Sequence, residues 1–144
     1  MKTRIPFIIA ALMLLFSANT NATPKNVKPF VVPEIREWQG GTGNFAITKK
    51  TRITYSQQEL ADVANLLAGD ISKMFGIKVK ATNGTPKQGD ISLAIENNAA
   101  LNSEGYTVDI NDNITIKANS TRGAIWATRT LLQIAEQNGG NLPK

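Results

Sequence analysis

The stretch from Glu104 to Ile134 constrains the fold most, because its hydrophobic period changes once within a short run of chain. Over residues 106–117 apolar and polar side chains alternate, which is the period of strands that bury one face. Asn111-Asp112-Asn113 interrupts the alternation with residue types that tolerate turns, so we predict a β-hairpin there. From about Arg122 to Gln137 the period becomes helical, with Ser120 as a candidate N-cap. The predicted apolar stripe of this helix is Ala124, Ile125, Thr128, Leu131, Leu132 and Ala135.

A second amphipathic helix is predicted upstream, over about residues 57–75. Ser56 and Glu59 have the spacing of a capping box, and Gly76 is suited to the left-handed residue that ends a helix. The spacing of the apolar residues puts them on one face that is buried against a sheet. They are Leu60, Val63, Ala64, Leu67, Ile71 and Met74.

Four further short segments read as strands, at 45–47, 52–55, 77–82 and 90–96. The segment 77–82 alternates apolar and basic residues, which favours an edge strand whose lysines discourage aggregation. The predicted order is ββαββββα. We therefore expect an α+β fold of two layers, with a short-stranded, mostly antiparallel or mixed sheet and both helices on one face.

Residues 1–22 have the pattern of a signal peptide: Lys2 and Arg4, an apolar run from Ile5 to Phe16, then small and polar residues. We expect an exported, periplasmic or extracellular protein that has no membrane contact after removal of this leader. One α+β domain is expected over 23–144, with its ordered part at about 30–139. The chain has no cysteine, so an apolar core rather than disulfides must stabilise it.

Composition excludes several chemistries. The chain has no histidine and no cysteine, so it lacks Ser-His and Cys-His nucleophile pairs and the common zinc ligands. The formal charge is +5, but its basic residues are scattered, which does not favour a nucleic-acid partner. Residues 109–113 are the segment most similar to a calcium-binding loop, but their pattern is more typical of the predicted hairpin turn. We therefore expect no cofactor and no metal-ligating residue.

Few residues are candidates for a site. Glu34, Glu37 and Glu104 are more typical of surface ion pairs or caps than of paired glycosidase carboxylates. Trp38 is interpreted as a packing anchor, with a sugar-stacking platform as the alternative. Trp126 lies off the helical stripe. We predict that Trp126 and Ile134 form an exposed apolar patch for a partner.

These motifs together resemble a known family. The segments S-E-G-Y-T-V-D-I (103–110), I-T-I-K-A (114–118) and R-G-A-I-W-A-T-R-T-L-L-Q-I (122–134) are similar to the end of the N-terminal domain of glycoside hydrolase family 20 β-N-acetylhexosaminidases. Upstream, V-V-P-E-I-R-E-W-Q-G-G-T-G-N-F-A-I (31–47) resembles the family's opening segment. Ile125 and Ala127 depart from the pattern, where an aromatic residue and glycine are common. The matching positions are Glu104, Tyr106, Ala118, Gly123, Trp126, Thr130, Leu131 and Gln133.

The resemblance implies an accessory, scaffolding domain in front of a catalytic (β/α)₈ barrel of the same parent polypeptide. In the family, that barrel removes terminal N-acetylhexosamine with retention, using the substrate's acetamido oxygen and an Asp-Glu pair. This chain contains no Asp-Glu dipeptide and ends about where the barrel would begin, so we expect a fragment that lacks the barrel. No catalytic residue is carried over, and the chain alone is expected to be inactive. Two alternatives remain: a free-standing carbohydrate-binding module that uses Trp38 or Trp126, or a periplasmic interaction domain.

Overall fold

The computed structural model describes residues 23–144, so the predicted signal peptide lies outside the described residues. The predicted order ββαββββα is confirmed, with a short 3₁₀ turn before the first helix and one further strand at the end. The elements are β1 (Asn44–Ala46), β2 (Arg52–Tyr55), η1 (Gln58–Leu60), α1 (Ala61–Phe75), β3 (Lys80–Asn83), β4 (Ile91–Ile95), β5 (Tyr106–Ile110), β6 (Ile114–Ala118), α2 (Thr121–Gln137) and β7 (Asn141–Pro143).

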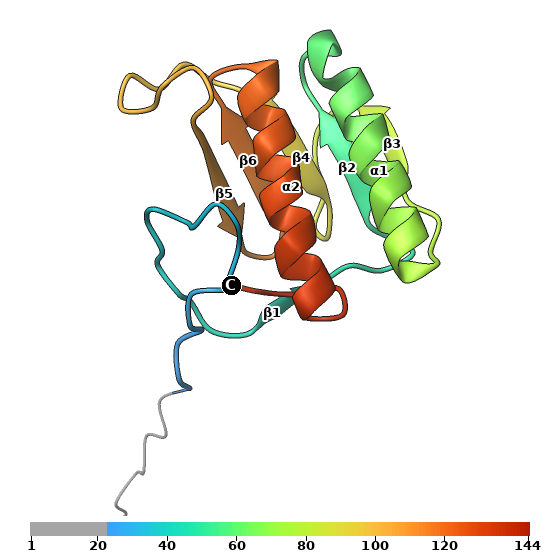
Figure 1. The fold of residues 1–144 in the computed structure, drawn as a ribbon. Coiled ribbons are helices and arrows are strands. Elements are labelled where there is room, and N and C mark those ends of the chain that lie inside the picture. The colour runs from blue at the N-terminus through green and yellow to red at the C-terminus, as the bar shows by residue number, and fades with distance from the viewer. Residues whose placement is uncertain (1–22) are drawn as a thin grey trace, which may run out of the picture.

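The main sheet has five strands in the order β3-β2-β4-β6-β5, and both helices cover one of its faces (Figure 1). The β2–β3, β2–β4 and β4–β6 pairs are parallel, whereas β5 and β6 form the predicted antiparallel hairpin. The predicted α+β class, with a mixed sheet under two helices, is therefore confirmed. β3 lies at an edge of the sheet, as its alternating lysines predicted.

β1 belongs to a separate two-stranded sheet. It pairs antiparallel with β7, with Phe45 opposite Leu142. Both of these side chains are buried in the hydrophobic core. β2 is already flanked by β3 and β4 in parallel, so β1 and β2 do not form a hairpin. Local sequence gave no sign of β7, because its three residues form a strand only through a partner almost a hundred residues away.

The two helices begin differently. At α2 the prediction is confirmed, since Ser120 Oγ accepts a hydrogen bond from the Gly123 N–H at 3.2 Å. The capping box predicted for Ser56 and Glu59 is wrong, because Gln57 precedes η1 and no side chain caps that turn. The Ser56 hydroxyl instead donates to Oε1 of Gln57. Gly76 ends α1 with φ 65°, as predicted.

The stripe of α1 is buried as predicted except at its end, where Met74 is 37% exposed. On α2 the buried surface is wider than the predicted stripe and includes Ala127, Thr130 and Ile134. Ile134 is only 2% exposed, so the predicted exposed patch is wrong at this position. Trp126, at 49% exposed, is confirmed as lying off the buried stripe.

Residues 26–35, here called the strap, are bonded to the last two turns of α2. The Val32 N–H donates to Gln133 Oε1 at 2.9 Å, and Gln133 Nε2 donates to the Val32 carbonyl at 2.9 Å. One turn further along α2, Gln137 Nε2 donates to the Phe30 carbonyl at 2.6 Å. Val31 between these contacts is 2% exposed. The strap is thus held against the end of α2 by the side chains of two glutamines.

We expect Gln133→Ala to loosen the strap without unfolding the domain. Alanine removes both the acceptor for the Val32 N–H and the donor to the Val32 carbonyl, so two hydrogen bonds are lost, at a cost of about 1 kcal/mol each. Amide hydrogen exchange should show faster exchange at Val32 and unchanged exchange in β4 and β6. Gln88→Ala, in an exposed loop, is the matched control; equal exchange at Val32 in both variants would contradict the role of Gln133.

Candidate functional site

Ligands of open sheets with parallel strands commonly bind beyond the carboxyl ends of those strands. The binding point lies between two adjacent strands whose following segments lead to opposite edges of the sheet. Here that point lies between β2 and β4. β2 leads through α1 to the edge strand β3, and β4 leads toward β5 and β6. The side chain of Gln57 occupies this position, donating to the Ile95 carbonyl at 2.9 Å and accepting from the Ile95 N–H at 3.2 Å. The chain itself therefore supplies the hydrogen-bonding partner at this point.

A second side-chain amide organises the loop after β4. Asn119 Oδ1 accepts from the Asn98 N–H at 2.7 Å, and Asn119 Nδ2 lies 2.9 Å from the Asn98 carbonyl and 2.9 Å from that of Leu101. Gln57, Asn119 and Gln133 thus each bind the backbone N–H and carbonyl of a single residue. Gln57 does so at the last residue of β4, Asn119 in the loop after β4, and Gln133 on the strap. Sequence reasoning missed all three roles.

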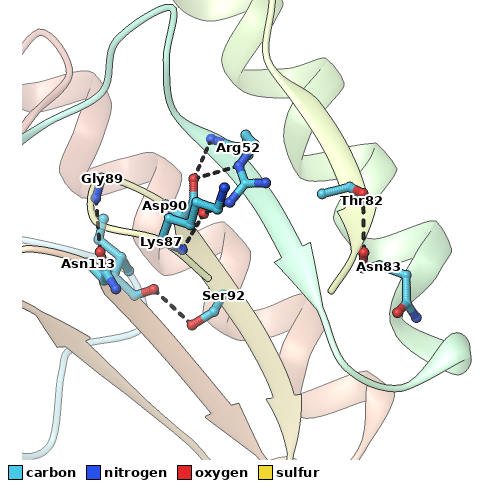
Figure 2. Close-up of polar contacts among 9 residues, drawn as sticks. Arg52, Thr82, Asn83, Lys87, Gly89, Asp90, Ser92 and Asn113 are labelled. Carbon is cyan, nitrogen blue, oxygen red and sulfur yellow. Dashed lines mark hydrogen bonds and ion pairs between the residues drawn. The ribbon is translucent and has the colours of Figure 1, made fainter. Parts of the chain in front are cut away.

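The most enclosed charged group is Asp90, just before β4. Its carboxylate accepts from the Arg52 backbone N–H at 3.2 Å, from Arg52 Nε at 3.1 Å and from the Lys87 N–H at 2.7 Å. Arg52 Nη2 also pairs with Asp90 Oδ2, and Figure 2 shows the carboxylate between the start of β2 and the turn at Lys87. Burial of Asp90 favours its neutral form, but the hydrogen bonds from Arg52 and Lys87 outweigh burial and hold the pKa of Asp90 below its usual value.

The Asp90–Arg52 pair stabilises the fold and is not a reactive site. The groups that bond the Asp90 carboxylate are all donors, and they stabilise its charged form. It joins the amino ends of two parallel strands that are 38 residues apart in sequence. The signal available in the sequence is that Arg52 and Asp90 each stand at the start of a predicted strand. Only the parallel register of β2 and β4 brings them together.

The carboxylates singled out from the sequence are not brought together. Glu34 pairs with Lys28, whose hydrogen bond and charge hold the pKa of Glu34 below its usual value. Glu37 is exposed. Glu104 pairs with Arg122 at 3.1 Å, which agrees with its interpretation as a member of a surface ion pair. Asp109 lies in β5, and Asp112 lies in the hairpin turn, where it pairs with Lys144 at 2.8 Å.

The two tryptophans have different surroundings. Trp38 is partly buried, and its Nε1 lies 3.4 Å from the Asn26 carbonyl, so it anchors the start of the strap. Trp126 is about half exposed, and its indole N–H makes no hydrogen bond within residues 23–144.

Trp126 belongs to a larger feature, here called the outer helix surface, which consists of Leu66, Asp70, Trp126 and Arg129. Asp70 on α1 and Arg129 on α2 form an ion pair at 2.9 Å across the two helices. The paired atoms, Asp70 Oδ2 and Arg129 Nη2, are buried but do not have hydrogen-bond geometry. Leu66 and Trp126 precede the pair by one turn on their helices and are 51% and 49% exposed. Large apolar side chains thus flank a charged pair with unused hydrogen-bonding capacity.

The matched motif residues around Gly123 have a packing role. A Cβ at Gly123 would lie 2.9 Å from the Gly105 carbonyl oxygen and 3.2 Å from the carbonyl carbon of Glu104, so α2 approaches the start of β5 as closely as its backbone allows. Next to this contact, the Tyr106 hydroxyl lies 2.6 Å from Thr130 Oγ1. These residues bind β5 to α2 and leave no opening between them.

Within residues 23–144, no cluster of three or more Asp, Glu, His or Cys side chains has the arrangement of a metal site. No helix of that described part is long and apolar enough to cross a membrane. The polar clusters around Gln57, Asn119 and Asp90 stabilise loops and strand ends.

The comparisons with known proteins agree on the family. The sequence model described as glycosyl hydrolase family 20, domain 2, matches residues 28–144. A lacto-N-biosidase from Bifidobacterium bifidum is 30% identical over 132 residues, which is 88% of this chain and 12% of the relative.

Among solved structures, the family 20 β-N-acetylhexosaminidase from Streptomyces coelicolor A3(2) is similar to 71% of this chain with a TM-score of 0.63 and 23% identity, over 20% of its own length. The chitobiase of Flavobacterium johnsoniae is similar to 65% of this chain with a TM-score of 0.50 and 23% identity, over 16% of its own length. The described chain thus spans a small part of each of these proteins. The match over residues 28–144, with the motifs that meet between β5 and α2, shows that the chain belongs to glycosyl hydrolase family 20, as its domain 2.

Proposed function

We propose that this domain is a non-catalytic scaffold of an exported family 20 glycoside hydrolase and that its outer helix surface packs against the catalytic barrel. The parent enzyme would hydrolyse terminal N-acetylhexosamine residues. The observation that carries the proposal is the outer helix surface, where Leu66 and Trp126 stay half exposed beside the partly exposed ion pair of Asp70 and Arg129. Exposed apolar surface of this kind marks an interaction site.

The chemistry of the outer helix surface suits a permanent contact within one polypeptide. Obligate interfaces bury apolar side chains around a few satisfied polar groups. The side chains of Arg129 and Asp70 are 36% and 25% exposed beside the apolar residues, so polar groups of the barrel would pair with their outward atoms. The matching region is only 12% of the lacto-N-biosidase and 20% of the Streptomyces enzyme, so most of each polypeptide is available to cover this surface, and the family resemblance implies that the barrel does so.

A scaffolding role is also supported by a relative of different activity. The structure titled as a GH138 enzyme targeting pectin rhamnogalacturonan II is similar to 66% of this chain with a TM-score of 0.51. At 18% identity this shows the fold alone. A fold that recurs beside different activities is better explained by support of a catalytic domain than by catalysis of its own.

The docking proposal is tested in a chimera in which residues 28–144 replace the matching domain of the Streptomyces coelicolor enzyme. We expect Leu66→Ala and Trp126→Ala to lower the melting temperature of the chimera much more than they lower that of the isolated chain. Phe30→Ala, an exposed apolar residue of the strap, is the control. Equal effects in the chimera and the isolated chain would rule out docking through this surface.

For the isolated chain, we expect Trp126→Ala to cost well under the roughly 3–5 kcal/mol typical of a buried tryptophan. The reason is that half of the side chain is already in water. Urea denaturation followed by far-ultraviolet circular dichroism measures the loss. A cost in the buried range would place Trp126 in the domain's own core and remove it from the proposed interface.

The absence of catalysis is tested directly. The purified chain should release no aryl alcohol from an aryl N-acetylglucosaminide above the blank, whereas a family 20 hexosaminidase in the same assay should. Export is tested by expressing the chain with and without residues 1–22 in a bacterial host. We expect the product in the periplasm or medium only when those residues are present.

A further inference from the structure

A shallow hollow of about 280 Å³ lies on the main sheet beyond the carboxyl end of β4. Its lining comes from the loop after β4 and from β5 and β6: Glu96, Asn97, Asn98, Ala99, Leu101, Thr107 and Lys117. Thr107 and Lys117 are register partners, and both alternate with the residues that face the helices. The hollow is therefore on the sheet face opposite the outer helix surface, so the proposed barrel contact would leave it open.

The loop that forms one wall is held in place before any ligand arrives. Asn119 binds the backbone of Asn98 and Leu101, and the Ala100 N–H donates to Asn98 Oδ1 at 3.0 Å. The Glu96 N–H bonds the Ala118 carbonyl at 2.9 Å, which fixes the start of the loop against β6. A wall that is already ordered avoids much of the entropy cost that weakens binding by flexible loops.

The polar groups of the hollow are mixed in kind and largely unused. The side chains of Asn97 and Thr107 make no hydrogen bond within residues 23–144, and Nδ2 of Asn98 is likewise unpaired within this range. Glu96 and Lys117 form an exposed pair at 3.1 Å, which leaves donor and acceptor capacity on both. Amide, hydroxyl, carboxylate and ammonium groups around a small apolar wall suit a neutral ligand that carries many hydroxyls.

We propose that this hollow is a contact site for one neutral sugar unit. Its volume is at the small end for ligand sites, which fits a single ring rather than a chain. The opposed charges of Glu96 and Lys117 give no net attraction for an anion or a cation, so an uncharged ligand is favoured. Without an aromatic residue for stacking, the affinity should be in the millimolar range. The site would give the domain a weak direct contact with a glycan, independently of the docking proposal.

The test is a nuclear magnetic resonance titration of the chain with N-acetylglucosamine, galactose and glucose, each up to saturation, and with glycerol as a non-ring polyol. We expect saturable shifts of the amides around the hollow, centred on Asn97, Thr107 and Lys117, with at least one sugar and none with glycerol. Shifts that increase linearly without saturation, or that centre on Trp126, would refute the site.

Variants make the test specific. Asn97→Ala and Thr107→Val each remove one neutral hydrogen-bonding group and should weaken binding about three- to tenfold. Asn65→Ala, which removes an exposed amide from α1, is the matched control and should bind like the wild type. Unchanged affinity in both hollow variants would overturn the proposal. This outcome is distinguishable from failure of docking, which is read from the melting temperature of the chimera.

Discussion

Asp90→Asn is expected to lower the free energy of unfolding by about 2–3 kcal/mol at about pH 7. The carboxylate accepts hydrogen bonds from two backbone N–H groups and from the Arg52 guanidinium, and its side chain is 3% exposed. An amide keeps the size of the side chain but loses its charge and one acceptor oxygen. Asp90 connects the amino ends of β2 and β4 (Figure 2), so the substitution weakens the contact between two adjacent strands of the main sheet.

The same variant should change the dependence of stability on pH. The folded-state pKa of Asp90 is lowered, so the group stabilises the fold above its unfolded pKa of about 3.9, and this stabilisation is lost as the pH falls through the folded pKa. Urea denaturation from about pH 7 downward should therefore show a smaller acid-induced loss in Asp90→Asn than in the wild type.

Asp112→Asn is the matched control for this pH experiment. Lys144 holds the pKa of Asp112 below its usual value, but this carboxylate is exposed on the hairpin turn. Solvent screens such a pair, so we expect little change in stability. The interpretation of Asp90 is wrong if the two variants have the same free energy of unfolding at about pH 7 and lose the same amount of it as the pH falls.

Gly123→Ala is expected to destabilise the domain by about 1–3 kcal/mol, although alanine is the better helix former. The new Cβ would lie 2.9 Å from the Gly105 carbonyl oxygen, and the neighbouring obstacles are backbone atoms that cannot rotate away. The Gly105 carbonyl is itself held by the Asn119 N–H at 3.2 Å. Relief of the clash therefore requires α2 to move away from β5.

Gly69→Ala supplies the matched control within the other helix. A Cβ at Gly69 would meet no atom within 4 Å, so the same chemical change should stabilise the domain by about 0.5–1 kcal/mol. Opposite signs for the two variants in urea denaturation would separate close packing from helix propensity. Equal signs would show that α2 can shift freely over β5.

The helices and the hairpin were predictable because local chemistry determines them. The apolar spacing of α1, the left-handed Gly76 at its end and the Asn-Asp-Asn turn between β5 and β6 each depend on a few neighbouring residues. Ser120 likewise caps α2 through a contact three residues away. The error at Ser56 has a local cause too, because the Ser56 hydroxyl bonds Gln57 instead of capping the helix.

The sequence by itself determined the two-layer α+β class, the family and the exposure of Trp126. Only the tertiary structure decided the parallel pairing of β2, β3 and β4, the strand β7, the Asp90–Arg52 pair and the burial of Ile134. The physical reason is range. Helical periodicity and turn chemistry are encoded within a few residues, whereas these contacts join groups far apart in the chain, whose own neighbourhoods carry no sign of the partner. Gln133 makes the point most directly: its motif was readable, but its hydrogen bonds are to Val32, 101 residues away.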